Sequence, residues 1–157
     1  MNVIFLDFDG VINTPIWSVK NGELSCDYNH PSDGTVNNFQ AVQWVSEFCE
    51  KYNYHIVVSS TWRIGDFDLA KCLYDSGLRK RIKVIGVTPR LYTSRGDEIT
   101  EWLELNQHVK NYLIFDDDND MTKHMHRLVK CNQAVGFTMD SYNHAVSLHK
   151  AFNSKGD

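Results

Sequence analysis

Two carboxylates spaced by one residue, Asp7 and Asp9, follow a short apolar run at the start of the chain and precede Gly10. The run is rich in Val, Ile and Phe, which is typical of a strand buried on both faces. Residues i and i+2 of an extended chain point the same way, so the two carboxylates would stand together beyond the strand end. Adjacent carboxylates repel and are costly to desolvate unless a cation holds them. Since Mg²⁺ prefers oxygen ligands, the opening predicts a Mg²⁺-assisted site.

Two further apolar runs are also followed directly by polar residues. Residues 55–58 run into Ser59, Ser60 and Thr61, and residues 111–115 run into the acidic run 116–120. Each apolar run is short enough to be one buried strand. The residues that follow these runs are hydroxyls and carboxylates, which are suited to phosphate and metal binding.

The elements between these runs indicate how the polar residues come together. Apolar residues spaced by three or four predict helices near 39–49, 67–74 and 99–105, and two more apolar runs, 82–85 and 133–137, predict strands. Alternating strands and helices predict right-handed βαβ units and a parallel sheet. Ligands bind at the carboxyl edge of such a sheet. We therefore expect Asp7, Asp9, Ser59, Asp116 and Asp117 at one edge.

Each of these signals has a plainer interpretation when it is taken alone. An isolated Asp-x-Asp is often a loop or a helix cap, and Ser59 to Thr61 is compatible with the N-cap of a following helix. The acidic run 116–120 is compatible with a solvated turn. The coincidence of three strands that deliver suitable residues to the same edge favours a functional site.

These residues resemble motifs of the haloacid dehalogenase (HAD) superfamily of phosphohydrolases. The segment Asp7-Phe-Asp9-Gly-Val resembles the first motif, Ser59 after an apolar strand resembles the second, and Asp116-Asp117 resembles the acidic pair of the fourth. The third motif is normally a Lys, sometimes an Arg, at a helix start. Arg95 stands at that place in the chain, and Arg90 is the reserve candidate.

A closer resemblance is to a small capless subgroup whose members occur alone or attached to nucleic-acid (RNA) repair proteins. It is carried by the sequence Ser-Ser-Thr-Trp-Arg at 59–63, by Arg-Gly-Asp-Glu-Ile at 95–99, and by the acidic run. The resemblance implies a Rossmann-like three-layer α/β sandwich around a central parallel sheet. It also implies a single domain over 1–157.

The resemblance implies a role for each matching residue. Asp7 would be the nucleophile that forms an aspartyl-phosphate, and Asp9 would be the general acid and base. Mg²⁺ would be held by Asp7, the Asp9 carbonyl, and Asp116 or Asp117, of which Asp116 is favoured because it comes first after the strand.

The remaining candidates would bind the phosphoryl group or the substrate. Ser59 would hydrogen-bond the transferring group, and Arg95 would neutralise its charge. Gly10 would let the chain leave the strand, and Ser60 and Arg63 are further phosphate or substrate contacts. For Arg63 an ion pair with the acidic run is the alternative.

The segment after the first motif indicates how open the site is. Residues 14–36 are polar and rich in turn residues, so they predict a hairpin flap and no separate cap domain. An open site suits bulky substrates. Candidate surfaces for stacking a nucleobase are Trp17, Tyr28, Trp62 and Tyr92, with a packed core aromatic as the alternative for each.

Composition narrows the class of protein. The chain has 157 residues, a hydrophobic fraction of 42% and a net charge of −4, so it is neither disordered nor a generic nucleic-acid binder. Residues 77–96 carry six Lys or Arg and no acid, which is typical of a phosphate path or of a solvated helix end. The four dispersed cysteines favour a reducing cytoplasm. The spacing of His124 and His126 does not favour zinc, and no run is long enough to cross a membrane.

We therefore expect a Mg²⁺-dependent phosphatase acting on a phosphomonoester, with a nucleotide or a nucleic-acid end as candidate substrates. The alternatives are a non-catalytic module that keeps the fold and the Mg²⁺ site, and a phosphotransferase or dehalogenase using the same Asp7. The sequence leaves the substrate and the oligomeric state open.

Overall fold

The computed structural model describes residues 1–27 and 34–153, except for the Trp17 side chain. Its centre is a five-stranded sheet in which all neighbouring strands are parallel. In spatial order the strands are β5 (Val84–Val87), β4 (Tyr54–Val58), β1 (Asn2–Leu6), β6 (Asn111–Asp116) and β7 (Leu128–Lys130).

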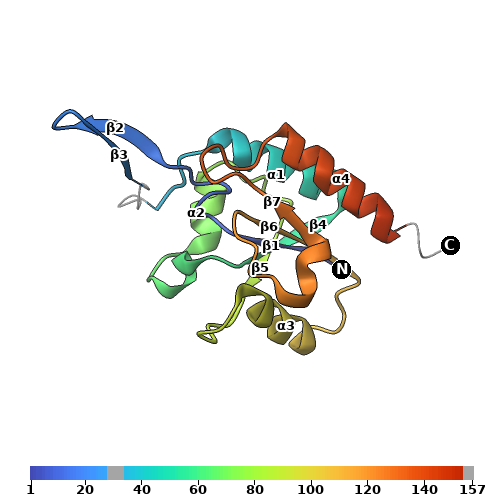
Figure 1. Cartoon of the computed structure of the whole chain (residues 1–157). Coiled ribbons are helices and arrows are strands. Elements are labelled where there is room, and N and C mark those ends of the chain that lie inside the picture. Colours follow the sequence, from blue (N-terminus) through green and yellow to red (C-terminus); the bar gives the residue numbers. More distant parts are fainter. Residues whose placement is uncertain (28–33, 154–157) are drawn as a thin grey trace.

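Helices cover both faces of this sheet, which gives three layers (Figure 1). One face packs against α1 (Phe39–Tyr52), α2 (Leu69–Asp75) and α4 (Met139–Asn153), and the other against α3 (Arg95–Leu105) and the 3-10 helix η2 (Thr122–Arg127). A second 3-10 helix, η1 (Thr61–Ile64), follows β4. The predicted Rossmann-like three-layer sandwich is therefore confirmed, with no separate cap evident among the described residues.

Strand β1 explains why its sequence reads as continuously apolar. Ile4 and Leu6 enter the core beneath α1, α2 and α4, whereas Val3 and Phe5 enter the core beneath α3. All four side chains are fully buried, because a central strand of a covered sheet has no solvent face.

The predicted flap within 14–36 contains an antiparallel hairpin of β2 (Ile16–Lys20) and β3 (Glu23–Asp27). It projects from the body of the molecule (Figure 1). Val19 and Leu24 pair across it and are 71% and 70% exposed. Tyr28, one of the predicted stacking residues, lies outside the described residues, as does the Trp17 side chain.

Two predicted strands are displaced. The expected strand at 133–137 is wrong: the edge strand β7 comes earlier, and residues 132–136 form a turn closed by a bridge between Asn132 and Gly136. Gly136 has a φ of +73° and Val135 is 54% exposed, so this apolar-looking run turns at the surface. The strand expected at 82–85 is β5, which begins at Val84.

The helices differ from expectation mainly at their ends. The helix expected at 67–74 begins at Leu69, because the Asp68 side chain caps it by accepting a hydrogen bond from Lys71 N. The pattern 99–105 lies inside α3, which begins at Arg95. Helix α4 was not predicted, although Tyr142, Ala145 and Phe152 recur at helical spacing and pack against the core. None of the described helices is long and apolar enough to cross a membrane.

Candidate active site

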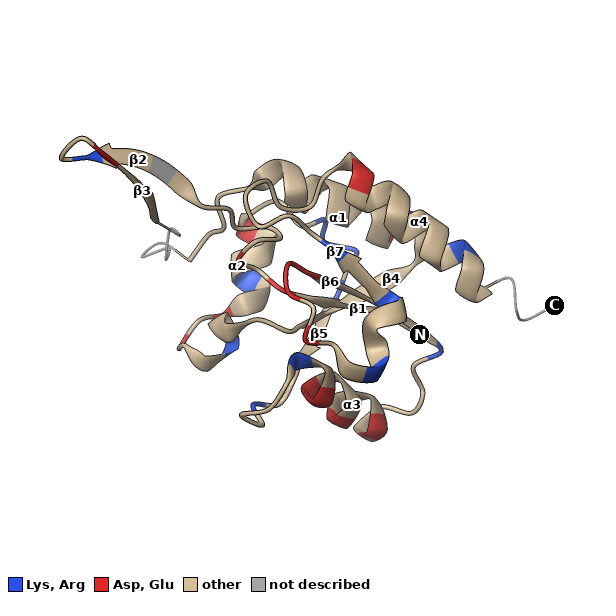
Figure 2. Cartoon of the chain, viewed as in Figure 1, with Lys and Arg blue, Asp and Glu red and all other residues tan. Residues whose placement is uncertain are grey.

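The strand register brings the predicted polar residues to one edge of the sheet. Leu6 of β1 is aligned with Val58 of β4 and with Phe115 of β6. Because the three strands are parallel and end at the same level, the next residues along the chain emerge together: Asp7, Ser59 and Asp116. Figure 2 shows the acidic loops that follow β1 and β6 side by side at this edge.

A tight loop carries the chain away from Asp7. The Phe8 carbonyl accepts hydrogen bonds from the backbone N–H groups of Val11, Ile12 and Asn13, at 2.8 to 3.1 Å. Gly10 has a φ of +78°, and a Cβ atom there would lie 2.4 Å from Cγ of Asp117. A glycine is therefore required at position 10 for two reasons: the backbone conformation and the close approach of Asp117.

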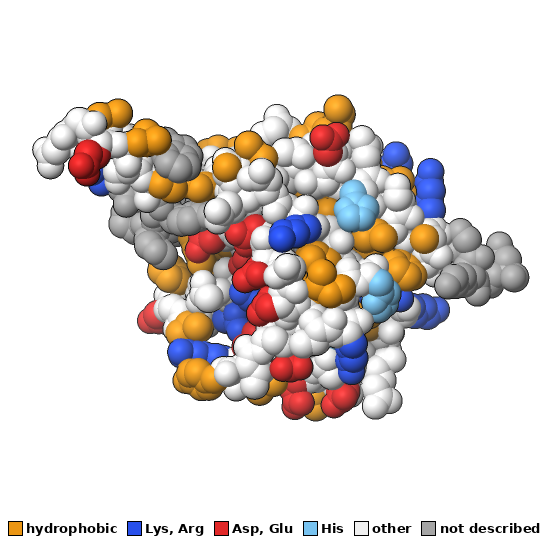
Figure 3. Space-filling view, viewed as in Figure 1, with side chains coloured by type: hydrophobic (Ala, Val, Ile, Leu, Met, Phe, Trp, Pro, Cys, Tyr) orange, Lys and Arg blue, Asp and Glu red, His pale blue; other side chains and the backbone are white. Residues whose placement is uncertain are grey.

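Three carboxylates converge beside this loop. Asp7, Asp116 and Asp117 each present a ligand oxygen, and these oxygens all lie within 4.8 Å of one another. Asp7 and Asp116 are buried and Asp117 is half-buried. Figure 3 shows acidic side chains along a hollow in the surface, with basic side chains inside it.

The electrostatics of this cluster are unfavourable without a cation. Burial raises the pKa of Asp7 to about 6, while Arg95, the Phe8 N–H group and the Ser60 hydroxyl each act to lower it. Burial, and then the charge of Asp7, raise the pKa of Asp116 well above its usual range. The cluster thus favours protonation unless positive charge is added.

One atom of the cluster indicates where that charge belongs. Oδ2 of Asp116 is buried and has no hydrogen-bond partner among the described residues, and the nearest cationic atom, Nε of Arg95, is 3.7 Å away. Oδ1 of the same carboxylate accepts a hydrogen bond from Asp118 N at 2.9 Å. A buried carboxylate oxygen without a donor, beside two more carboxylates, fits a hard divalent cation such as Mg²⁺.

Asp9 lies apart from this cluster and is held separately. Its Oδ1 accepts from Nδ2 of Asn13 at 2.7 Å, and its Oδ2 accepts from Nε1 of Trp62 at 3.1 Å. The Trp62 ring is 5% exposed and packs edge-on against Phe8, with ring centroids 5.1 Å apart. Trp62 is therefore a packed core aromatic and not an exposed stacking surface. Its indole N–H orients the Asp9 carboxylate.

Arg95 lies at the first position of α3, where its backbone is fixed on both sides. Its N–H donates to the Asp120 carboxylate at 3.0 Å, and the Gly96 N–H donates to the Asp120 carbonyl at 3.1 Å. Its Nη1 donates to the Ser59 carbonyl and lies 3.5 Å from the Ser59 hydroxyl. The place expected for the third-motif cation is thus occupied by Arg95, whereas Arg90 lies over the ring of Tyr92.

The two serines after β4 lie inside the site. Ser59 and Ser60 are fully buried. The Ser59 hydroxyl lies 3.5 Å from Oγ1 of Thr88 and from Nη1 of Arg95. Ser60 caps η1 by accepting from Trp62 N and also hydrogen-bonds the Asp7 carboxylate.

Arg63 has a partner that was not expected. Its Nη2 lies 2.5 Å from Oε2 of Glu98, and both side chains are almost fully buried. The predicted ion pair with the acidic run is therefore wrong, because α3 packs beside η1 and supplies the nearer carboxylate. Arg63 also donates to the Ser60 carbonyl at 2.6 Å, so it braces the backbone beneath the site.

Sequence reasoning missed three supporting residues. Asn13 contacts Asp9 through a local turn, whereas Asp120 and Glu98 contact Arg95 and Arg63 across the fold. Only Glu98 had a sequence signal: it precedes Trp102 by four positions, so an acid lies on the apolar face of the helix and needs a buried partner.

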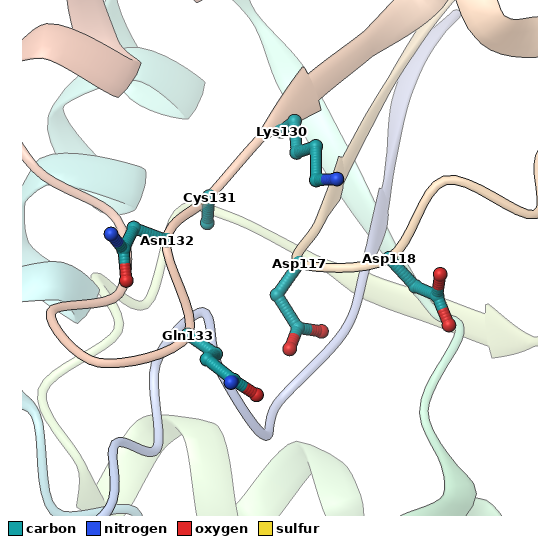
Figure 4. A pocket seen from close by; sticks show the side chains of 6 residues that line it. All are labelled: Asp117, Asp118, Lys130, Cys131, Asn132 and Gln133. Carbon is teal, nitrogen blue, oxygen red and sulfur yellow. The ribbon is translucent and has the colours of Figure 1, made fainter.

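A pocket of about 680 Å³ opens beside Asp117 (Figure 4). The lining includes Lys130, Asn132 and Gln133, which come from the end of β7 and the turn after it. Gln133, the first residue of the run that was expected to form a strand, thus borders the acidic cluster, and the site is open on this side.

Comparison with known proteins agrees with this geometry. A search of curated proteins finds no match for the chain. A family model described as the HAD domain in Swiss Army Knife RNA repair proteins matches residues 3–142, which include the whole edge of the sheet that holds the candidate site. The chain therefore belongs to this family of HAD domains.

Proposed function

We propose that the protein is a Mg²⁺-dependent phosphatase that hydrolyses a phosphomonoester through an aspartyl-phosphate. The observation that carries the proposal is the placement of Asp7 in the three-carboxylate cluster beside the Arg95 guanidinium. A carboxylate attacks a phosphate only where the repulsion between them is offset, and this site holds both a cationic side chain and a carboxylate cluster that could hold a cation.

In the first half-reaction, a carboxylate oxygen of Asp7 attacks phosphorus and forms a new O–P bond. The bond to the leaving oxygen breaks, and Asp9 donates a proton to that oxygen. The Asn13 and Trp62 contacts hold both oxygens of the Asp9 carboxyl group, so its orientation is set before the substrate arrives.

In the second half-reaction, water attacks the phosphorus of the aspartyl-phosphate. Asp9 accepts the proton of that water, the O–P bond to Asp7 breaks, and inorganic phosphate leaves. Arg95 balances the charge of the phosphoryl group in both halves. The Ser59 and Ser60 hydroxyls are our candidates for hydrogen bonds to its oxygens, with Gly10 giving the loop its close approach.

Asp7, Asp116 and Asp117 would hold Mg²⁺, together with the Asp9 carbonyl. When bound, the ion would offset the charge of the carboxylates and of the phosphate. The unpartnered Oδ2 of Asp116 supports this assignment. The Arg63 guanidinium is engaged by Glu98, so we assign it a positioning role in place of the predicted phosphate contact.

A phosphorylated nucleic-acid end is the substrate class that we favour. The family description places such domains in RNA repair proteins, and the site lacks a separate cap among the described residues. A strand end enters an uncovered site more readily than an enclosed one.

The test is release of inorganic phosphate from p-nitrophenyl phosphate and from oligonucleotides with 3′- or 5′-phosphates, with Mg²⁺ or with EDTA. We expect Asp7→Asn to lose at least about a thousandfold in kcat/KM, which corresponds to about 4 kcal/mol of barrier. The matched control is Asp118→Asn, which removes an exposed carboxylate of the same acidic run. Release that persists in Asp7→Asn, or that does not need Mg²⁺, contradicts the proposal.

A further inference from the structure

The loop 88–94, between β5 and α3, is attached to the candidate site at both ends. At its start, Oγ1 of Thr88 lies 3.5 Å from the Ser59 hydroxyl. Just beyond its end, Arg95 donates to the Ser59 carbonyl. Both ends of this loop therefore lie at the candidate site.

The buried Arg63–Glu98 pair also holds the backbone of this loop. Nη2 of Arg63 donates to the Pro89 carbonyl at 3.5 Å, and Leu91 N donates to Oε1 of Glu98 at 3.2 Å. The exposed fractions of the Arg63 and Glu98 side chains are only 6% and 7%. Contacts on both sides of position 90 fix where the loop tip lies.

The tip presents an aromatic ring to solvent. Tyr92 is 81% exposed, and its φ of +57° is unfavourable for a bulky residue. The Arg90 guanidinium lies over its ring, 4.4 Å from the centroid. A strained and exposed tyrosine contributes little to the core, so function is the better account of its position.

The chemistry of this pair matches single-stranded nucleic acid. Nucleobases stack on exposed aromatic faces whatever their sequence, and an arginine beside the ring adds a cation–π contact or a phosphate contact. In addition, residues 77–96 carry six basic residues and no acid, so the surrounding chain does not repel a phosphate backbone.

Chain geometry limits how far this ring lies from the reacting phosphate. Tyr92 and Arg95 are three residues apart, so their Cα atoms are at most about 11 Å apart. A stacked strand advances about 3.4 Å for each nucleotide. A base on Tyr92 would thus belong to one of the first few nucleotides next to a phosphate at Asp7.

We propose that the Arg90–Tyr92 pair is a stacking platform for the nucleotides adjacent to the phosphorylated end of a single strand. The platform would select strand ends over small phosphate esters. This inference rests on the proposed function and deepens it by naming the substrate class and the residues that recognise it.

The test compares wild type with Tyr92→Asn and Tyr92→Phe. Asparagine tolerates a positive φ and has no ring, so Tyr92→Asn removes the stacking surface without adding backbone strain. We expect it to raise KM for a phosphorylated pentanucleotide by about fivefold to a hundredfold. It should leave kcat/KM for p-nitrophenyl phosphate unchanged, and Tyr92→Phe should behave as wild type.

Arg90→Ala should also weaken binding of the oligonucleotide and raise its KM. The matched control is Arg81→Ala. Arg81 is an exposed arginine of the same basic stretch but lies outside the loop. RNA and DNA strands with 3′- or 5′-phosphates serve as separate arms, since stacking alone does not distinguish them.

Fluorescence anisotropy of a labelled, phosphorylated oligonucleotide tests the platform without turnover. If Tyr92→Asn binds the oligonucleotide more weakly than wild type and Tyr92→Phe do, the platform is supported even when no phosphate is released. The absence of phosphate release would count against the proposed function alone. Equal oligonucleotide binding and equal KM in wild type and Tyr92→Asn overturn the platform, and phosphate release from p-nitrophenyl phosphate would then leave the phosphatase proposal intact. Wild-type hydrolysis of p-nitrophenyl phosphate without binding of any oligonucleotide also overturns it.

Discussion

Removing the charge of Asp7 is expected to stabilise the metal-free protein at neutral and alkaline pH, although it abolishes the proposed activity. Asp7 is 7% exposed, and burial raises its pKa from 3.8 to about 6. The folded protein therefore holds the Asp7 proton more tightly than the unfolded chain does. Ionising this carboxyl group costs folding free energy, and an Asn at the same place does not bear that cost.

The size and the pH range of the effect follow from the two pKa values. Each pKa unit corresponds to about 1.4 kcal/mol, so the difference between 3.8 and about 6 amounts to about 3 kcal/mol. The stabilising contribution of the protonated Asp7 carboxyl group is present in wild type below the pKa of the unfolded chain, and it is lost as the pH rises through the pKa of the folded protein. Asp7→Asn should therefore match wild type near pH 4 and be more stable by about 3 kcal/mol near pH 8.

The measurement is the free energy of unfolding by urea in EDTA, followed by tryptophan fluorescence at several pH values between about 4 and 8. The chain has four tryptophans as reporters. The control Asp118→Asn removes an exposed carboxylate and should change stability by no more than about 0.5 kcal/mol. In thermal unfolding near pH 8, the expected rise in Tm for Asp7→Asn is roughly 6 to 12 °C.

Mg²⁺ should reverse the order of the two proteins. An ion that binds only the folded state adds about 4.1 kcal/mol at a thousandfold excess over its Kd, which exceeds the difference of about 3 kcal/mol, and Asp7→Asn lacks one of the proposed ligands. The reasoning is refuted if Asp7→Asn is less stable than wild type in EDTA near pH 8. A stability difference that stays constant between about pH 4 and pH 8 refutes it equally.

Two further predictions concern the loop after β1 and the residue that orients Asp9. Gly10→Ala should weaken Mg²⁺ affinity by about tenfold or more, measured by calorimetric titration, because the new Cβ would displace Asp117. Its control is Gly22→Ala, which has a similar φ of +81° but nothing within 4 Å, and equal affinities in the two variants would contradict the close-approach account. Trp62→Phe keeps an aromatic ring but loses the Nε1 donor to Asp9, so kcat should fall by about tenfold with little change in KM. An unchanged kcat in Trp62→Phe would show that the hydrogen bond does not orient the acid.

The sheet edge was predictable because it depends on local patterns. Asp7, Ser59 and Asp116 each follow an apolar run long enough for one strand, and parallel strands with helical crossovers place such residues together without further information. The register that aligns Leu6 with Val58 and Phe115 follows from the same patterns, since each run ends where its polar residue begins.

The errors came where local pattern and tertiary context disagree. Residues 133–137 are apolar enough for a strand, but Gly136 at a positive φ bends the chain, and the edge strand β7 is formed earlier, at Leu128–Lys130. Helix α4 was missed because its apolar residues, among them Tyr142 and Phe152, are interrupted by polar residues and remain only partly buried.

Local patterns in the chain were sufficient to predict the layered fold, the sheet edge that holds the candidate site, and the types of residue at that edge, because strand length and apolar periodicity are local properties. The partners of these residues follow from how the elements pack in three dimensions. The Trp62–Asp9 and Arg63–Glu98 contacts join residues 53 and 35 positions apart, and no periodicity links them. Burial and the convergence of three carboxylates likewise arise only when separate strands pack, since desolvation and repulsion depend on distance in space and not along the chain.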